Sequence, residues 1–216
     1  MADAFQLGVD TFGDVTVDAG GQLQSQAQVL RDVVDEAVVA DQAGLDAFGV
    51  GEHHRADFAI SAPEVVLAAI AARTSRILLG SAVTVLSTDE PVRVFQRFST
   101  LNAISSGRAE VILGRGSFTE SYPLFGYDLA HYEELFEEKV RLFAELLKGG
   151  PVTWSGSTGP DLQGRIIYPP VENGGLRAWV GVGGSPQSVV RAARTTDSGL
   201  PPTPTHVRSV PVSIGG

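Results

Sequence analysis

Short apolar runs alternate along this chain with stretches in which apolar residues recur at helical spacing. The runs that read as strands cover residues 5–10, 47–50, 76–85, 109–113 and 176–182. In the stretches between the first four runs, apolar residues return every three or four positions, as on the buried side of an amphipathic helix. Alternating strands and helices are typical of a parallel sheet with crossover helices. The pattern predicts an α/β protein, either a smaller sheet or an incomplete (β/α)8 barrel of about five to six βα units.

Local signals mark where the helices begin and end. Gly44 stands where the C-cap of the first helix belongs. Pro63 suits the first turn of the second helix, after a cap at Ser61 or Ala62. The clearest apolar stripe runs from Tyr132 to Leu147, and the glutamates between its members predict a solvated outer face.

Two segments depart from this alternation. Residues 149–175 are rich in glycine and proline, with β-prone pieces at 152–154 and 166–168, which predicts an excursion such as a hairpin before the last strand. Residues 195–216 contain four prolines and no helical stripe. We therefore expect a domain over residues 1–194 and a poorly ordered, proline-rich tail over 195–216, which a frameshift or premature stop would explain.

Composition narrows the classes of partner and compartment. The chain has 216 residues, a net charge of -9 and no basic cluster, which argues against nucleic acid as a partner. It has no cysteine, which excludes disulfides and thiolate metal sites and fits a reducing cytosol. No signal-peptide pattern or apolar run of about 20 residues occurs, so we expect no membrane partner and a cytoplasmic location.

The candidate chemistry begins with Gly51-Glu52-His53-His54, which follows the second predicted strand. Polar groups at the carboxyl ends of buried strands are where α/β folds carry their sites. One histidine here could exchange protons or hydrogen-bond a ligand in a pocket, or both could be structural. Adjacent strand residues point to opposite faces and Glu52 is the only nearby carboxylate, so no metal site is predicted.

Two further segments suit an anion. Arg115 lies between two glycines at the end of the fourth strand, where it could meet a phosphate or carboxylate, or be a surface arginine in a turn. Residues 183–188 form a glycine turn before a helix, whose free N–H groups could bind a phosphate. Ser185 could equally be a plain N-cap followed by Pro186.

In these residues the chain resembles the bacterial luciferase-like family of flavin-dependent monooxygenases, over about residues 5–194. The resemblance rests on motifs that occur in order and at similar spacing: Gly51-Glu52-His53-His54, residues 77–86 leading to Pro91-Val92-Arg93, and Ser106-Gly107-Arg108 before Gly114-Arg115-Gly116. It implies a TIM-type barrel that binds FMN at the carboxyl ends of its strands. The chain departs from the family at its end, where strands six to eight do not follow.

The resemblance also implies roles for single residues. His53 matches the active-site histidine that assists the chemistry, and Arg115 matches an arginine that contacts the flavin phosphate. The remaining matches complete the expected cofactor site: Gly184, Ser185 and Ser188 at the phosphate, and Ser81, Ala82 and Val83 behind the flavin ring, where the family often has a non-proline cis peptide.

The implied reaction is oxygen activation. Reduced FMN, supplied by a separate flavin reductase, would react with O2, and the activated oxygen would pass to a small organic substrate. Two alternatives stay open: a deazaflavin-dependent oxidoreductase that transfers hydride, and a flavin-binding protein or fragment without turnover. Members of the family often dimerise through their early helices, so a homodimer is also an expectation.

Overall fold

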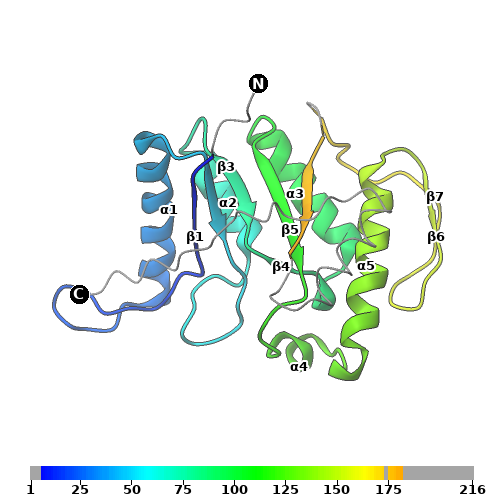
Figure 1. Ribbon diagram of the computed structural model, residues 1–216, viewed down its shortest axis with the longest axis horizontal. Helices are drawn as coiled ribbons and strands as arrows, with labels where there is room; N and C mark the ends of the chain where they lie inside the picture. The colour runs from blue at the N-terminus through cyan, green and yellow to red at the C-terminus, as the bar shows by residue number, and fades with distance from the viewer. Residues whose placement is uncertain (1–5, 173–174, 182–216) are drawn as a thin grey trace.

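A parallel sheet forms the frame of the described chain, which comprises residues 6–172 and 175–181 of a computed structural model. Its strands run in the order β1-β2-β3-β5-β4, and β8 pairs with β5. All of these pairings are parallel, so the strands end at one common edge (Figure 1). The strands of this sheet are β1 (Gly8–Thr11), β2 (Ala47–Val50), β3 (Leu78–Ser81), β4 (Thr84–Val85), β5 (Ala109–Gly114) and β8 (Arg177–Val180).

Helices connect successive strands and cover one face of the sheet. In Figure 1, α2 and α3 lie behind the strands, α1 and α5 stand at the two sides, and α4 lies at the edge where the strands end. The helices are α1 (Gln26–Ala43), α2 (Pro63–Ala71), α3 (Pro91–Ile104), α4 (Ser121–Phe125) and α5 (Tyr132–Leu147), with 3-10 turns η1 (Leu86–Thr88) and η2 (Leu129–His131). The predicted α/β alternation is confirmed, with four βα units and a fifth strand in the described residues.

The helix ends follow the predicted signals. Gly44 ends α1 in the left-handed conformation with a φ of 85°, which glycine adopts without a β-carbon clash. Pro63 opens α2, and the N-cap is Ala62, whose side chain makes no capping hydrogen bond. The short helix α4 was not predicted, because its five residues are too few to show a period.

Strand boundaries differ more from the prediction than helix boundaries do. The first strand lies at Gly8–Thr11, within and just beyond the predicted 5–10. The predicted single strand 76–85 is divided into β3 and β4, which pair with different parts of β5. The peptide bond between Ala82 and Val83, in the interval that separates them, is cis.

The predicted excursion after α5 is an antiparallel hairpin of β6 (Val152–Trp154) and β7 (Leu162–Arg165). It lies outside α5 at the right of Figure 1. The prediction of a β-prone piece at 166–168 was wrong, because the pairing strand ends at Arg165. Within the hairpin loop, Ser157 and Thr158 hydrogen-bond the carboxylate of Glu138 on α5.

The core lies between the sheet and its helices. Phe95 of α3 and Phe143 of α5 pack edge to face with ring centroids 6.2 Å apart. At the amino end of the sheet, the carboxylate of Asp41 accepts backbone N–H bonds from residues 75–77. Arg108 donates there to four backbone carbonyls, those of Ala71, Thr74, Ile77 and Ser105. These contacts fix the amino edge and leave the carboxyl edge for the site.

Candidate active site

The segments singled out in the sequence follow the carboxyl ends of neighbouring strands. Gly51-Glu52-His53-His54 follows β2, Ala82-Val83 follows β3, and Arg115 follows β5. Because β2 pairs with β3 and β3 with β5, all in parallel, these segments meet at one edge of the sheet.

His53 is held in an aromatic cluster. The residue is 8% exposed, and its ring stacks on Phe58 with a centroid distance of 4.4 Å. Phe12 and Phe118 approach the same ring at 5.0 and 4.8 Å. Its backbone N–H donates to the carbonyl of Ile60 at 3.0 Å. The imidazole is thus fixed in orientation and shielded from water, as a proton-exchanging group in a pocket must be.

Glu120 supplies a carboxylate beside this ring. Its Oε1 lies 3.5 Å from Nδ1 of His53, and the residue directly precedes α4. A carboxylate beside one imidazole nitrogen orients the ring and favours the tautomer with the proton on that nitrogen. Sequence reasoning missed Glu120, because it lies 67 positions from His53 in a loop with no periodic signal.

His54 points to different partners, as expected for adjacent residues at a strand end. Its Nε2 lies 2.9 Å from Oε1 of Glu52, and its ring meets Phe125 edge on at 5.0 Å. The hydrogen bond to Glu52 raises the pKa of His54; burial opposes this, and the charges of Glu52, Glu120 and Asp89 add to the rise. His54 is therefore biased toward the imidazolium form.

Glu52 joins two strand ends. Besides contacting His54, its Oε2 accepts a hydrogen bond from the backbone N–H of Val85 in β4 at 2.9 Å. Its side chain is 8% exposed. Sequence reasoning placed Glu52 in the motif and gave it no role; its carboxylate holds β4 to the end of β2.

Ala82 and Val83 form a small apolar platform, and glycines surround it. A β-carbon at Gly114 would come within 2.4 Å of Cγ2 of Val83, and one at Gly181 within 3.1 Å of Cγ1. Gly51, after β2, makes room mainly for Phe12, since its β-carbon would lie 2.0 Å from Cδ1 of that ring and 3.1 Å from the carbonyl oxygen of Ala82. The cis peptide that the resemblance implied in this segment is present between these two residues.

Ser81, predicted to contact a cofactor, has its side chain inside the sheet. The residue is fully buried. Its hydroxyl accepts a hydrogen bond from the N–H of Ile112 at 3.1 Å and donates to the carbonyl of the same residue at 3.3 Å. In this structure the hydroxyl of Ser81 bridges β3 and β5.

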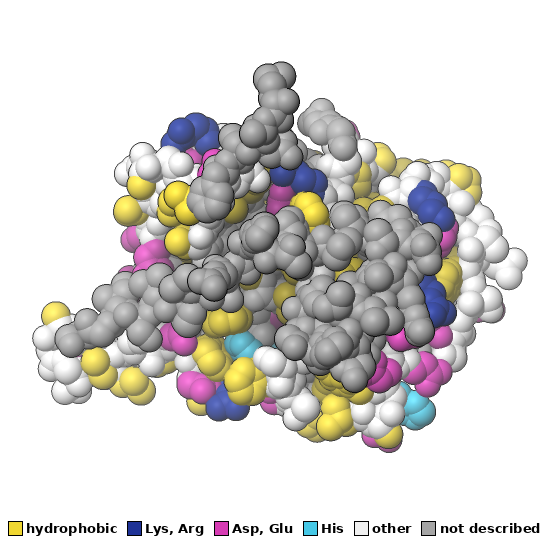
Figure 2. Space-filling view, in the orientation of Figure 1, with side chains coloured by type: hydrophobic (Ala, Val, Ile, Leu, Met, Phe, Trp, Pro, Cys, Tyr) yellow, Lys and Arg dark blue, Asp and Glu magenta, His cyan; other side chains and the backbone are white. Residues whose placement is uncertain are grey.

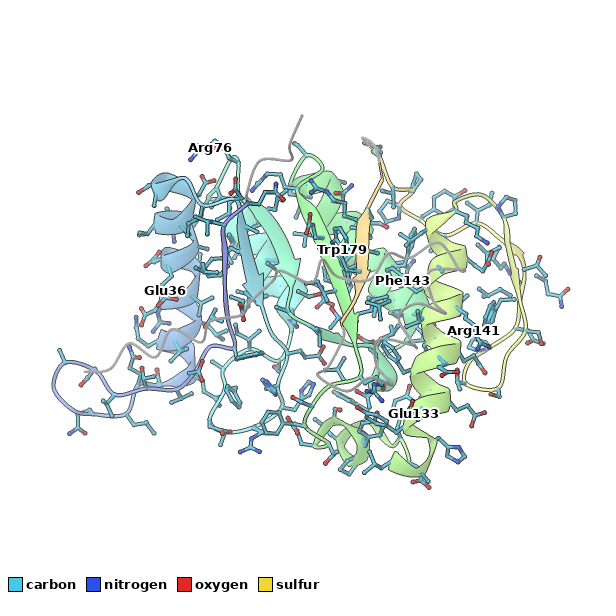
Figure 3. The ribbon with its side chains drawn as sticks, in the orientation of Figure 1. Glu36, Arg76, Glu133, Arg141, Phe143 and Trp179 are labelled. Atoms are coloured by element: carbon cyan, nitrogen blue, oxygen red, sulfur yellow. The ribbon has the colours of Figure 1, made fainter. Side chains whose placement is uncertain are left out.

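Arg115 faces the start of α5. Its Nη1 lies 2.7 Å from Oε1 of Glu133, and its guanidinium carbon lies 4.9 Å from the ring centroid of Tyr132. The side chain is 21% exposed. Figure 3 shows Glu133 at the end of the molecule where the strands finish, opposite to Arg76 at the amino edge. An arginine at this position can hold an anion, in competition with the Glu133 carboxylate.

Next to Arg115, several polar side chains are buried between η1, α4 and α5. Tyr122 is 1% exposed and its hydroxyl faces Ser87. Lys139 is 2% exposed, and its Nζ donates to the carbonyl of Ser87 at 2.7 Å. Sequence reasoning missed Lys139, because it directly follows two glutamates on a helix whose polar face was predicted to be solvated.

Other predicted features lie outside the described residues. These are Gly184, Ser185 and Ser188, the expected phosphate turn, and the tail 195–216 with the end of the domain at residue 194. Within the described part, no group of three or more acidic, histidine or cysteine residues could hold a metal ion. No helix there is long and apolar enough to cross a bilayer. On the face seen in Figure 2, the Lys and Arg side chains that are described stand in scattered groups.

The arrangement suits a flat aromatic ligand with an anionic arm. Ala82 and Val83 offer an apolar surface that Gly114 and Gly181 pack against, His53 adds a shielded imidazole, and Arg115 adds a cation at the α5 side. These are the features that a flavin ring and its phosphate require. The residues present therefore fit a flavin.

Relatives with assigned names match part of this chain. Among relatives, 4-hydroxyprotoasukamycin monooxygenase of Streptomyces nodosus subsp. asukaensis is 36% identical over 115 residues, 52% of this chain and 31% of that protein. N-acetyl-S-alkylcysteine monooxygenase of Bacillus subtilis is 32% identical over 123 residues, 56% of this chain and 37% of that protein. The chain thus spans less than two fifths of the length of these two relatives.

Solved structures share the fold at lower identity. The monooxygenase RslO1 from Streptomyces bottropensis superposes with a TM-score of 0.76 and 20% identity, over 92% of this chain and 68% of that one. The oxygenating constituent of 3,6-diketocamphane monooxygenase from Pseudomonas putida, in complex with FMN, gives 0.69 and 18%, over 92% and 64%. An F420-dependent secondary alcohol dehydrogenase gives 0.69 and 19%, over 87% and 55%.

The fold prediction is confirmed by these structures: the described sheet is part of a TIM-barrel of the luciferase-like type. The sequence model for luciferase-like monooxygenases matches residues 11–206, which is most of the chain. The chain therefore belongs to the luciferase-like monooxygenase family.

Proposed function

We propose that this chain binds a flavin at the carboxyl edge of its sheet and takes part in the oxygenation of a small organic substrate by reduced FMN and O2. The observation that carries the proposal is the meeting of His53, the Ala82–Val83 platform and Arg115 at three neighbouring strand ends. The match to the family over residues 11–206 supports it.

Each of these groups has a distinct task. The apolar platform supports the ring from behind, and the glycines at 114 and 181 make room for the side chain of Val83. Arg115 holds the phosphate, together with Gly184, Ser185 and Ser188, whose roles come from the family resemblance. When bound, reduced flavin supplies the electrons with which dioxygen is activated.

His53 is the proposed proton donor and acceptor. Glu120 lies near Nδ1, so Nε2 is left to exchange a proton with the substrate side. The rings of Phe12, Phe58 and Phe118 keep water from the imidazole, which favours oxygen transfer over loss of the activated oxygen to solvent. The substrate is therefore expected to be a small organic molecule with an apolar portion.

FMN is proposed as the flavin, supplied in reduced form by a separate reductase, and the working form is proposed to be a homodimer. The complex of the 3,6-diketocamphane enzyme with FMN supports this choice of cofactor. The second candidate is deazaflavin-dependent hydride transfer, which the F420-dependent alcohol dehydrogenase among the structural neighbours favours.

An FMN titration, followed by quenching of flavin fluorescence, tests the proposal. We expect saturable, micromolar binding by the wild-type chain, and a preference for FMN over F420. Arg115→Ala should weaken binding at least about tenfold, because a charged contact to phosphate is lost. Arg141→Ala is the matched control, since Arg141 is an exposed arginine on α5 that pairs with Glu137.

His53→Ala should give the opposite result. It should leave FMN affinity within about twofold of wild type and reduce formation of oxygenated product about 100-fold or more, with peroxide released instead. Tight FMN binding with no oxygen consumption in any variant would favour a binding protein over an enzyme. Tight F420 binding with no FMN binding would replace the proposal by hydride transfer.

A further inference from the structure

Lys139 is a buried lysine that the proposed function does not use. It lies on α5 and is 2% exposed. Its Nζ donates to the backbone carbonyl of Ser87 at 2.7 Å and lies 4.0 Å from the ring centroid of Tyr127. The Ser87 carbonyl belongs to η1, the turn that directly follows β4.

Among residues 6–172 and 175–181, no carboxylate lies within 4.0 Å of the Lys139 ammonium. The ion pairs found at that distance are made by histidines, arginines and Lys148. Burial of an ammonium group without an ion partner costs free energy of folding. Replacement of such a group by an apolar side chain is often neutral or stabilising. Stability of the fold therefore does not account for a lysine here.

The backbone that Lys139 holds is also held from the other side. Two residues earlier, the N–H of Val85 donates to the carboxylate of Glu52 at 2.9 Å. Glu52 follows β2 and Lys139 lies on α5. Two buried side chains of opposite charge therefore hydrogen-bond the backbone of the segment 85–87. This segment follows Ala82 and Val83 after only one intervening residue, Thr84.

We propose that Lys139 is a positioning residue: with Glu52 it clamps the segment 85–87 and thereby fixes the Ala82–Val83 platform on which the flavin ring would rest. The clamp itself is argued from the structure alone. Its effect on flavin binding rests on the proposed function. A rigid platform lowers the ordering cost that binding would otherwise carry.

The surroundings of the ammonium make the clamp sensitive to pH. Burial lowers the pKa of Lys139 to about 8, against the opposing charges of Asp89, Glu90 and Glu138. From α4 and the loop after it, Tyr122 faces Ser87 and Tyr127 faces the ammonium itself. As the pH rises through about 8, the ammonium loses its proton and with it the charge that strengthens its bond to the carbonyl.

The test compares Lys139→Met with Lys148→Met. The chain has only these two lysines, and Lys148 is exposed at the end of the same helix, where it pairs with Glu145. The first readout needs no flavin: amide hydrogen exchange in the peptide that covers residues 84–90. We expect exchange there to be about fivefold faster or more in Lys139→Met, unchanged in Lys148→Met, and unchanged in α1 of both.

The second readout is the FMN titration across the pH range around 8, with the thermal midpoint measured alongside. Lys139→Met should bind FMN about fivefold or more weakly than wild type at neutral pH, without a lower midpoint. Wild-type affinity should fall as the pH passes 8, and that of Lys139→Met should not. Unchanged exchange at residues 84–90 in Lys139→Met would overturn the clamp, and so would a lower midpoint with unchanged FMN affinity.

The two readouts separate this inference from the proposed function. If wild type binds no flavin while exchange at residues 84–90 depends on Lys139, the proposed function fails and the clamp stands as a structural device. If wild type binds FMN and Lys139→Met binds equally well at every pH, the proposed function stands and the positioning role is wrong.

Discussion

The side chain of Val83 occupies the space that a β-carbon at Gly114 would need. Such a carbon would lie 2.4 Å from Cγ2 and 2.9 Å from Cβ of Val83, well inside any contact distance. Val83 belongs to the segment between β3 and β4, and Gly114 is the last residue of β5. The Val83 side chain thus packs directly against the backbone at the end of β5, where only glycine leaves room for it.

Gly114→Ala should displace the platform. We expect a loss of about 1–3 kcal/mol in the free energy of unfolding, the usual cost of overpacking, and a larger relative loss of FMN affinity. Urea denaturation and the fluorescence titration measure the two effects. Gly80→Ala is the control, since its β-carbon would meet nothing closer than 4.0 Å and should leave both quantities nearly unchanged.

Glu133→Gln should strengthen flavin binding. In the structure Arg115 contacts the Glu133 carboxylate at 2.7 Å, and that carboxylate would also repel a phosphate. Removal of the charge should raise FMN affinity about two- to fivefold at low ionic strength, with a smaller gain at high salt, because the site is partly exposed. Weaker FMN binding by Glu133→Gln would show that Arg115 does not hold the phosphate.

Glu52→Gln should remove a pH dependence of stability near neutrality. The hydrogen bond to Glu52 holds the pKa of His54 above 6.5, so the ion pair contributes fully below pH 6.5 and is lost as the pH rises through the raised value. We expect wild type to lose this contribution, about 1–2 kcal/mol, on alkalinisation, and Glu52→Gln to lack it at every pH. Urea denaturation as a function of pH measures it, with Glu145→Gln as the control for an exposed carboxylate.

The β6–β7 hairpin should detach from α5 in acid. Partial burial raises the pKa of Glu138, but hydrogen bonds from Ser157 and Thr158 outweigh it and lower the pKa to about 2. The contact therefore contributes stability above pH 4.5 and loses it as the pH falls toward 2. Glu138→Gln should cost about 1 kcal/mol at neutral pH, a value discounted for solvent screening, and nothing near pH 2.

Gly156→Ala is a second variant for the same contact. Its β-carbon would lie 2.3 Å from Oε1 of Glu138, so the carboxylate would have to move from the two hydroxyls. Hydrogen exchange at residues 150–165 measures detachment of the hairpin. If wild type, Glu138→Gln and Gly156→Ala are equally sensitive to acid, the Glu138 contact does not hold the hairpin to α5.

Much of the fold could be predicted because its signals are local or periodic. Helix α5, the C-cap at Gly44 and the helix start at Pro63 follow from spacing and backbone preference alone. The division of 76–85 into β3 and β4 could not, because every residue there is compatible with one continuous buried strand. What divides it is the backbone between Ser81 and Thr84, which hydrophobicity does not report.

The candidate site was predictable only where it is contiguous in sequence. His53 and Arg115 stand out at strand ends, next to glycines. Glu120 and Lys139 acquire their roles from tertiary packing, one beside His53 and the other beneath η1. Ser81 was expected at the cofactor from the family resemblance, and the bonds of its hydroxyl to the backbone of Ile112 are a tertiary feature that the resemblance does not report.

The two stretches that pair with β5 are out of step by one residue. Leu79 pairs with Ala109, thirty positions along the chain, whereas Thr84 pairs with Leu113, twenty-nine positions along. One residue between them is therefore extra, and it puts Leu79 and Thr84 on the same face of the sheet although five positions separate them. Deletion of a single residue from 81–83 would let β3 and β4 run as one strand in a single register against β5, with Leu79 and Thr84 still on the same face. The Ala82–Val83 platform thus exists because the chain between β3 and β4 is one residue longer than the part of β5 that pairs with it.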